Sequence, residues 1–280
     1  MIYEDRAVAF VDILGFKDII ASTIEQNGNE IEEETKKLNS FFDEVNKEFS
    51  SEEKWTSIPD SCTRIVTHFS DSIVFSVKAA QKDGVLFLLD YFHYLIIIAI
   101  HYGFLIRGGI TYGKVCHTED KIFGPAMNAS YLMESNEAKF PRIVIHEDVL
   151  RATFKNRGPQ ADEDDVVKYL SHLVQKDTDG VFYLDYFSNV INGYEYAIDK
   201  YNYSQKIISI INNLDTKINS LSDEALKINL NSKSSWLKTK FNELLEEQKS
   251  IYSAEEYDDD DEFSELKSYF MKLHPYNVSQ

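Results

Sequence analysis

The sequence predicts an α+β domain followed by a helical extension. Three observations support this: a dense apolar strand near the amino terminus, strand-like runs that alternate with helix-periodic segments, and purely helical periodicity from about residue 189. A chain of 280 residues is long enough for one large domain with an extension. We therefore expect a domain over residues 1–188 and a helical extension with an acidic tail over 189–280.

Composition restricts the possible functions. The formal net charge is −18, which argues against a nucleic-acid binder, because such proteins neutralise phosphates with clustered lysines and arginines. Free nucleotides remain possible, since a metal ion can offset their charge locally. Hydrophobic content of 43% and aromatic content of 13% are typical of a globular protein.

Several features predict a cytoplasmic protein without a membrane span. The cysteines, Cys62 and Cys116, have no metal-site spacing, and the amino terminus lacks the basic and apolar stretches of a signal peptide. The most apolar stretch, 84–104, is interrupted by an aspartate and two histidines. A spanning helix needs about 20 apolar residues almost without charge, so we expect a core helix there.

An apolar run from Ala7 to Phe16 predicts a buried strand and the turn after it. The run places one carboxylate, Asp12, at the carboxyl end of the strand, just before Gly15. A desolvated carboxylate needs a partner, which is either a metal ion, an arginine or a set of backbone donors. The alternative is an ordinary turn or cap role.

The next segments alternate between helices and strands. Residues 17–49 have helical periodicity with a break at 27–29, and 68–77 holds two strand-like runs around a turn that contains Asp71. A helix over 82–101 precedes the run 104–115, whose three glycines indicate close approach by a ligand or another backbone, or a bulge. The later expected elements are a helix within 123–135, a strand over 142–146 with a short helix after it, and a strand over 180–185 that suits a sheet edge.

The last part of the chain is polar and then helical. Residues 156–165 shift to a polar, acidic composition, and beyond 189 the apolar spacing predicts two antiparallel helices with loops near Asp215 and 231–235. The run 255–265 contains eight acidic residues and no basic one. Such a run predicts a solvated or disordered segment, or an interaction tail.

The order of these elements fits a ferredoxin-like core with an antiparallel-rich sheet. In such a core the first strand lies beside the hairpin, so Asp12 and Asp71 converge. Two carboxylates at adjacent strand ends suit a pair of divalent ions, one polarising a phosphate and the other activating an attacking hydroxyl. The carbonyl of Ile13 and the amides of Gly15 and Phe16 are candidates for further metal and phosphate contacts.

Four motifs resemble, in their order along the chain, those of the class III nucleotidyl cyclases. Phe10–Phe16 resembles the first metal strand, and Phe69–Ser72 resembles the second metal turn. Arg107–Gly113 resembles the glycine-containing strand, and Phe123–Glu134 resembles the helix that brings an asparagine to the ribose. The resemblance covers about residues 7–147 and implies the cyclase core fold.

The departures from that family point to one of its branches. Purine cyclases have a base-reading lysine where this chain has Thr67, an arginine where it has Leu132, and a base-reading aspartate near the position of Lys121. The pyrimidine cyclases of the Pycsar anti-phage systems resemble the chain more closely. They share its Asp-Ile-Leu-Gly-Phe strand, Phe-Ser-Asp turn, Arg-Gly-Gly strand, Phe-Gly-Pro-Ala segment and helical extension.

The resemblance implies a reaction and its participants. UTP or CTP would be converted to the 3′,5′-cyclic nucleotide, with UTP the commoner substrate in that branch, and a separate effector would respond to the product. Asp12, the carbonyl of Ile13, and Asp71 would hold two Mg²⁺ or Mn²⁺ ions. The enzyme would be a cytoplasmic homodimer whose sites are shared between the subunits.

The resemblance also implies roles for the other candidate residues, and each of them has an alternative explanation. Asn128 would contact the ribose, or it is an ordinary polar residue on its helix face. Arg107 would replace the arginine missing at Leu132, or it pairs with an acidic neighbour. Thr67 and Lys121 would line the base pocket, or they belong to a solvated strand edge. The competing hypothesis for the whole chain, suggested by Leu132, is a cyclase-like module that has lost activity and senses nucleotides or binds a partner.

Overall fold

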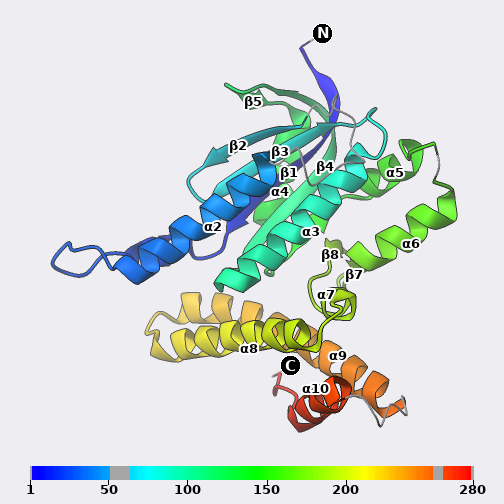
Figure 1. Ribbon diagram of the computed structural model, residues 1–280. Helices are drawn as coiled ribbons and strands as arrows, with labels where there is room; N and C mark the ends of the chain where they lie inside the picture. Colours follow the sequence, from blue (N-terminus) through cyan, green and yellow to red (C-terminus); the bar gives the residue numbers. More distant parts are fainter. Residues whose placement is uncertain (1, 51–63, 160, 255–260, 279–280) are drawn as a thin grey trace. The chain divides into compact units, whose positions relative to one another are not determined.

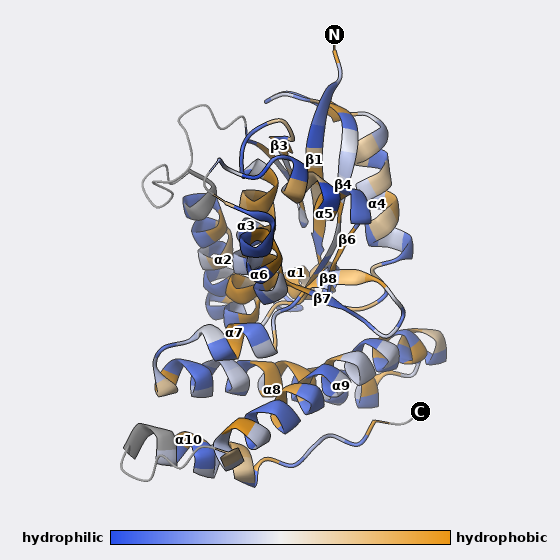
Figure 2. Cartoon of the chain, turned by 90° about the vertical axis from the view of Figure 1, so that its right-hand side faces the viewer, coloured by the Kyte–Doolittle hydropathy of each residue, from blue (hydrophilic) through white to orange (hydrophobic). Residues whose placement is uncertain are grey.

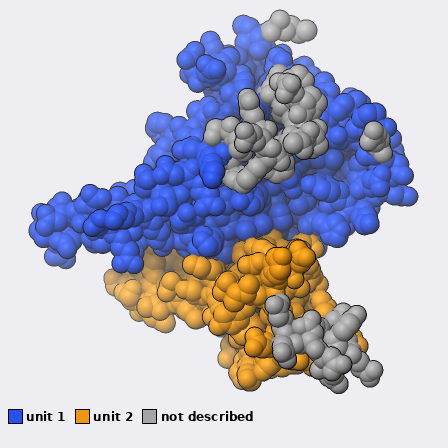
Figure 3. All heavy atoms as spheres, in the orientation of Figure 1, with its two compact units in different colours: residues 1–185 blue, residues 186–280 orange. Residues whose placement is uncertain are grey.

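The computed structural model describes residues 2–50, 64–159, 161–254 and 261–278. They form two compact units, Met1–Asp185 and Tyr186–Gln280 (Figure 3), whereas the sequence suggested a boundary after residue 188. The first unit holds a mixed eight-stranded sheet with helices, and the second is helical. The α+β class with carboxyl-terminal helices is confirmed.

The first unit alternates strands and helices along the chain (Figure 1). The expected break within residues 17–49 separates its first two helices. Its elements are β1 (Glu4–Ile13), α1 (Phe16–Ala21), α2 (Glu32–Ser50), β2 (Ile65–Phe69), β3 (Ser72–Lys78), α3 (Gly84–Tyr102), β4 (Ile106–His117), β5 (Ile122–Phe123), α4 (Pro125–Asn136), β6 (Ile143–Ile145), α5 (Glu147–Lys155), α6 (Glu163–Leu173), β7 (Val174–Lys176) and β8 (Phe182–Leu184).

The strands follow the order β2-β3-β1-β4-β6-β8-β7, and β5 pairs with β4. β1 lies between β3 and β4 and is antiparallel to both, while β4 and β6 are parallel. With α1, α2 and α3 as connections, β1 to β4 have the connectivity and spatial order of a ferredoxin-like unit. The other three strands extend the sheet beyond β4.

Helices cover both faces of the sheet around β1. α2 and α3 lie on one face and α4 lies on the other (Figures 1 and 2). On the α4 side, Val8 of β1 packs with Val74, Val115 and Ala126. Because side chains alternate along a strand, Asp12 shares this face with Val8. The sheet therefore presents Asp12 on the side that α4 covers.

α3 is the expected core helix. It is long and apolar enough to cross a membrane by length and composition, yet 67% of its most apolar window is buried inside the protein. No other helix in the described ranges passes that test. Among the cysteines, Cys116 is free and buried, and Cys62 lies outside the described residues.

Two glycines of β4 permit the close packing of its neighbours. A Cβ at Gly109 would lie 2.6 Å from the carbonyl oxygen of Ser130 and 2.6 Å from Cβ of Met133, both on α4. A Cβ at Gly108 would lie 2.6 Å from the carbonyl oxygen of Phe10. Of the explanations that the sequence left open for the glycines, close approach of another backbone accounts for these two.

The acidic stretch near residue 160 leads into a helix that the sequence analysis did not anticipate. The carboxylate of Asp162 accepts a hydrogen bond from the amide of Asp165, and the carboxylate of Asp165 accepts one from the amide of Asp162. This capping box, with acidic residues favoured at a positive helix end, starts α6. Val166, Leu170 and Leu173 form its buried stripe.

The position of the last strand also differs from the expectation. β8 lies inside the sheet, between β6 and β7, and is antiparallel to both. The short strand β7 occupies the edge that the sequence suggested for residues 180–185. Because β7 contributes only Val174–Lys176, its apolar pattern is too short to identify a strand.

The second unit consists of α7 (Ser188–Gly193), α8 (Ala197–Ser220), α9 (Glu224–Ala254) and α10 (Asp261–Lys272). The expected loops near Asp215 and 231–235 are wrong, because both positions are helical. Asp215 of α8 accepts a hydrogen bond of 2.7 Å from Ser234 of α9 and forms an ion pair of 2.7 Å with Lys238. These polar residues therefore join two helices.

The acidic run 255–265 ends in a helix. Residues 255–260 lie outside the described residues, whereas α10 begins at Asp261. Leu266 and Phe270 of this helix are buried, and the Phe270 ring stacks on Tyr252 of α9. The alternative of a disordered segment is thus wrong for 261–265, which belong to this helix, whereas Ser264 and Glu265 are exposed, as expected of a solvated segment.

Replacing Gly109 should disrupt the contact between β4 and α4. We expect Gly109→Ala to lower the free energy of unfolding by about 2–3 kcal/mol, because the new methyl group would meet backbone that cannot move away cheaply. Urea denaturation measures the effect. Gly193→Ala is the control, since a Cβ there has nothing within 4 Å. Equal stability of the two variants would contradict the close packing.

Candidate active site

Two aspartates from different elements meet at one end of the central strands. Asp12 of β1 lies opposite Ser72 of β3 and opposite Arg107 of β4. Asp71 lies in the tight turn between β2 and β3, and its carbonyl accepts a hydrogen bond of 3.2 Å from the amide of Ile13. The two carboxyl groups are within hydrogen-bonding reach of each other. The structure thus brings together both aspartates that the sequence singled out.

The turn that presents Asp71 has an unusual backbone. Ser70 has a φ of 55°, in the left-handed region that residues other than glycine rarely adopt. Such conformations persist where the surrounding structure enforces them, and they cluster at functional sites. Here the pairing of Phe69 with Ser72 closes the hairpin and holds Asp71 beside β1.

The pairing of the two aspartates changes the acidity of Asp12. Burial and the neighbouring Asp71 carboxylate raise the pKa of Asp12 from 3.8 to about 7, and Glu134 adds to the shift. Arg107 opposes it. Without a cation, Asp12 therefore holds its proton to a higher pH than an ordinary aspartate, and a divalent ion would have to displace that proton.

Arg107 forms an ion pair with Glu134 of α4. The Glu134 side chain is 4% exposed and the Arg107 side chain is 26% exposed. Of the two roles expected for Arg107, the structure therefore shows the pairing with an acidic neighbour. Glu134 is its only ion-pair partner in the part of the chain that the structure describes, so the guanidinium still faces the site with an excess of donors.

Glu134 is a site residue that the sequence analysis missed. It stands at helical spacing from the buried residues Ala126, Ser130 and Met133. This spacing would have placed a carboxylate on the buried stripe of the helix, which is costly without a cation nearby. The periodicity of α4 was therefore the signal that could have found it.

Asn128 lies on the other side of α4. It is exposed and shares its helix face with Tyr131 and Leu132, whose side chains are 51% and 53% exposed. No hydrogen bond or ion pair joins it to the aspartates among the described residues. Its position fits a contact with a molecule bound from outside as well as the ordinary polar role.

The predicted backbone contacts lie next to the aspartates. Gly15 has a φ of 74° and precedes the first turn of α1, where helix amides have no intrahelical partners. A phosphate contact of the Gly15 and Phe16 amides stays a prediction, while the Phe16 ring packs against Phe42 of α2. The role of the Ile13 carbonyl stays a prediction.

The two base-pocket candidates lie away from the aspartates. Thr67 of β2 is half-buried, and its hydroxyl lies 3.0 Å from Nε2 of His117. Lys121 is exposed in the turn between β4 and β5, where its carbonyl accepts a hydrogen bond of 2.9 Å from the amide of Thr118. Neither touches Asp12 or Asp71 in the described structure.

The paired carboxylates suit a hard divalent cation. Within the described ranges, no group of three or more His, Cys, Asp and Glu side chains has the arrangement of a metal site. Magnesium needs few protein ligands, because it usually keeps several waters and completes its shell with phosphate oxygens. The carboxylates of Asp12 and Asp71 lie close together, and the raised pKa of Asp12 reflects their repulsion. Such a pair fits a divalent cation of this kind.

No model of a protein family matches the chain. A search of curated proteins finds no match either.

The raised pKa of Asp12 predicts a pH-dependent stability. Its folded pKa of about 7 exceeds the ordinary 3.8, so its contribution is favourable below about pH 4 and is lost as the pH rises through 7. We expect Asp12→Asn to stabilise the cation-free protein by about 1 kcal/mol at pH 8, discounted for partial exposure, and to have much less effect at pH 4.

Chemical denaturation in EDTA at the two pH values measures this difference. Asp164→Asn, at an exposed position in the first turn of α6, is the matched control. A stability gain for Asp12→Asn that is the same at both pH values would contradict the raised pKa.

Proposed function

We propose that this chain is a pyrimidine nucleotide cyclase of the class III type, which converts UTP or CTP to the 3′,5′-cyclic nucleotide and pyrophosphate. The single observation that supports this best is the convergence of Asp12 and Asp71, together with the raised pKa of Asp12. A structural domain has no need to hold two carboxylates against their mutual repulsion. A site that binds cations and phosphates does.

The chemistry is an in-line displacement within one nucleotide. The ribose 3′-oxygen attacks the α-phosphorus, the bond from that phosphorus to the bridging oxygen breaks, and pyrophosphate leaves while the hydroxyl proton passes to solvent. Two Mg²⁺ or Mn²⁺ ions, when bound, neutralise phosphate charge and lower the pKa of the attacking hydroxyl. Catalysis is then mainly positioning and charge neutralisation.

Each residue has a role in this proposal. Asp12 and Asp71 hold the cations, and the amides of Gly15 and Phe16 bind phosphate oxygens. Arg107, positioned by Glu134, donates to the triphosphate as negative charge moves onto the leaving group. Its partial exposure beside the buried Glu134 supports this role, because the guanidinium is held on one side and accessible on the other.

The remaining role falls to Asn128, which binds the ribose. In a homodimer with shared sites, the exposed face of α4 would approach a second copy of the chain. Tyr131 and Leu132 on that face, and Phe69 beside Asp71 with 79% exposure, are apolar side chains that a partner subunit can cover. We place the enzyme in the cytoplasm as a second-messenger synthase in anti-phage defence, with a separate effector that responds to its product.

A second candidate function is a cyclase-like module without activity that senses nucleotides or binds a partner. The observation that favours it is Leu132, an exposed leucine where the resembling enzymes carry an arginine that contacts the transition state. The two candidates differ in turnover, which the following experiment measures.

Incubation with each of the four nucleoside triphosphates and Mn²⁺, followed by chromatography, tests the proposal. We expect a cyclic pyrimidine nucleotide and pyrophosphate, and Asp71→Ala should lower turnover at least about a thousandfold while the protein stays folded. Asp164→Asn, which lies outside the site, should retain full turnover.

The outcomes separate the hypotheses. Absence of a cyclic product from every triphosphate would favour the inactive module. Cyclic AMP as the main product would support nucleotide cyclase activity but contradict the proposed preference for pyrimidines. An Asp71→Ala protein that fails to fold would contradict the metal role of this side chain, since loss of one charge should relieve repulsion.

A further inference from the structure

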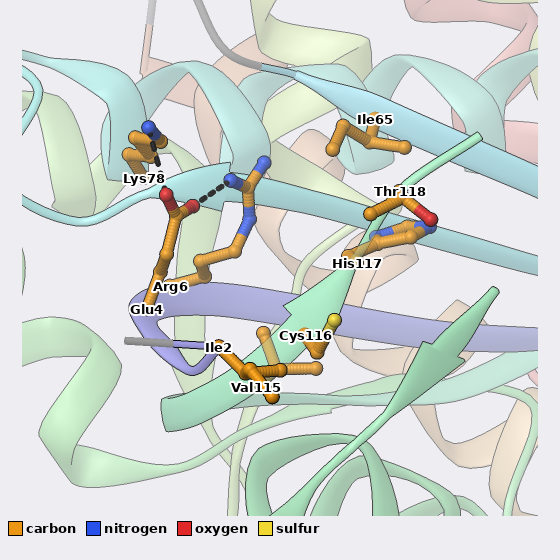
Figure 4. A pocket seen from close by; sticks show the side chains of 9 residues that line it. All are labelled: Ile2, Glu4, Arg6, Ile65, Lys78, Val115, Cys116, His117 and Thr118. Carbon is orange, nitrogen blue, oxygen red and sulfur yellow. Dashed lines mark hydrogen bonds and ion pairs between the residues drawn. The ribbon is translucent and has the colours of Figure 1, made fainter. Parts of the chain in front are cut away.

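A cavity of about 280 Å³ lies at the far end of the central strands from the aspartates, and the function proposed above does not use it (Figure 4). Arg6, which lines it, stands on the same face of β1 as Asp12 but six residues earlier, so roughly 20 Å separate their Cα atoms. The cavity is thus a separate place on the sheet. Its volume lies just below the usual range of ligand pockets, which suits a molecule smaller than a typical drug.

The charged side chains that line the cavity do not balance. Among the described residues they are Arg6, Lys78 and Glu4. Figure 4 shows the Glu4 carboxylate between the two cations, at 2.9 Å from a terminal nitrogen of Arg6 and 2.9 Å from Nζ of Lys78. His117 adds no charge, because burial and the nearby Arg6 lower the pKa of its ring to about 4. The lining therefore carries one net positive charge.

Hydrogen bonds hold the Arg6 guanidinium in one orientation. Its Nε donates to Oγ of Ser76 at 2.8 Å, and a terminal nitrogen donates to the Ser76 carbonyl at 3.1 Å. Oγ of Ser76 also lies 2.7 Å from Nδ1 of His117, and both of these side chains are buried. Because Arg6 itself is 1% exposed, solvent screens its charge only weakly. A charge that is already fixed in place attracts a ligand without a further cost of ordering.

Lys78 supplies a cation that can move. Its side chain is 41% exposed, and its ion pair with Glu4 is of the exposed kind that contributes little stability. The ammonium can therefore turn from Glu4 to a ligand at small cost. Thr118 adds an exposed hydroxyl, whose hydrogen bond to the Lys121 carbonyl is long at 3.4 Å.

The rest of the lining is largely apolar. Ile2, Ile65 and Val115 contribute branched aliphatic side chains from three separate segments of the chain. A phosphate monoester has between one and two negative charges at neutral pH, which exceeds the charge of the lining, and its phosphate would not contact these side chains. A carboxylate has one negative charge and can be attached to an apolar body. The lining thus favours a carboxylate.

We propose that this cavity is a second binding site, separate from the candidate active site, for a small monocarboxylate with an apolar body. The carboxylate accepts charge-assisted hydrogen bonds from Arg6 and Lys78. The apolar body contacts the three aliphatic side chains and is removed from water there. The site does not depend on the proposed cyclase activity, because none of its residues has a role in that reaction.

Phenylacetate and phenylacetamide test the site in the full chain. The two molecules have the same shape, and only the first is charged. In spectra of the isoleucine methyl groups, phenylacetate should shift the signals of Ile2 and Ile65 with a Kd of about 1 mM or lower, whereas Ile211 in the second unit should not move. Phenylacetamide should bind at least about tenfold more weakly. Equal binding of the two, or shifts confined to other isoleucines, would overturn the proposal.

Two substitutions with opposite effects test the charge balance. Lys78→Met keeps the length of the side chain and should weaken the binding of phenylacetate about fivefold, whereas Glu4→Gln removes the competing carboxylate and should strengthen it by a similar factor. Lys168→Met, at an exposed position on α6, is the matched control and should bind as the wild type does. An affinity that neither substitution changes would contradict the proposal. If a variant fails to fold, the comparison of phenylacetate with phenylacetamide still decides.

Competition identifies the class of anion. Hexanoate should displace phenylacetate, and inorganic phosphate should do so only at a higher concentration, because it has no apolar part to bury. Displacement by phosphate at a lower concentration than by hexanoate would assign the site to a phosphate and overturn the carboxylate. These measurements use no nucleotide, so their outcome is independent of whether the chain is a cyclase.

Discussion

The pairing of β1 with two neighbours is the constraint on which the rest of the first unit depends. One antiparallel register fixes Asp12 opposite Ser72, and the other fixes it opposite Arg107. A shift of one residue in either register would turn Asp12 to the other face of the sheet. The hairpin that holds Asp71 and the strand that holds Arg107 are thereby aligned with one carboxylate.

The sequence predicted this part of the structure well because the signals there are local and strong. The apolar run of β1, the polar turn before β3 and the glycines of β4 each identify an element without knowledge of its neighbours. Prediction was poorer where tertiary contacts decide the structure. Asp215 and Ser234 were interpreted as loop residues, and only the contact between α8 and α9 explains why polar side chains occur there.

The candidate site shows the same division between local and tertiary information. Asp12 and Asp71 could be predicted because each ends an apolar strand or interrupts a hairpin. The periodicity of α4 could have placed Glu134 on the buried stripe of the helix, but its partner could not be predicted, since the ion pair is formed with a residue 27 positions earlier. The hydrogen bonds that join Arg6, Ser76, His117 and Thr67 were equally hidden, because they link side chains of four strands, β1 to β4. His117 carried no recognisable spacing of a metal or catalytic histidine.

The contact of α4 with Gly109 determines how precisely the residues of the site are positioned. At Gly109 the backbone of the helix, at the carbonyl of Ser130, lies directly against the strand, whereas Ala126 packs on the sheet through side chains. Side-chain layers can be repacked in many ways, and each repacking shifts the elements they separate. A contact made by backbone atoms cannot be rearranged in this way. Substitutions of the surrounding hydrophobic residues should therefore change the distance between Glu134 and Asp12 little. A methyl group in place of the hydrogen at Gly109 would change it.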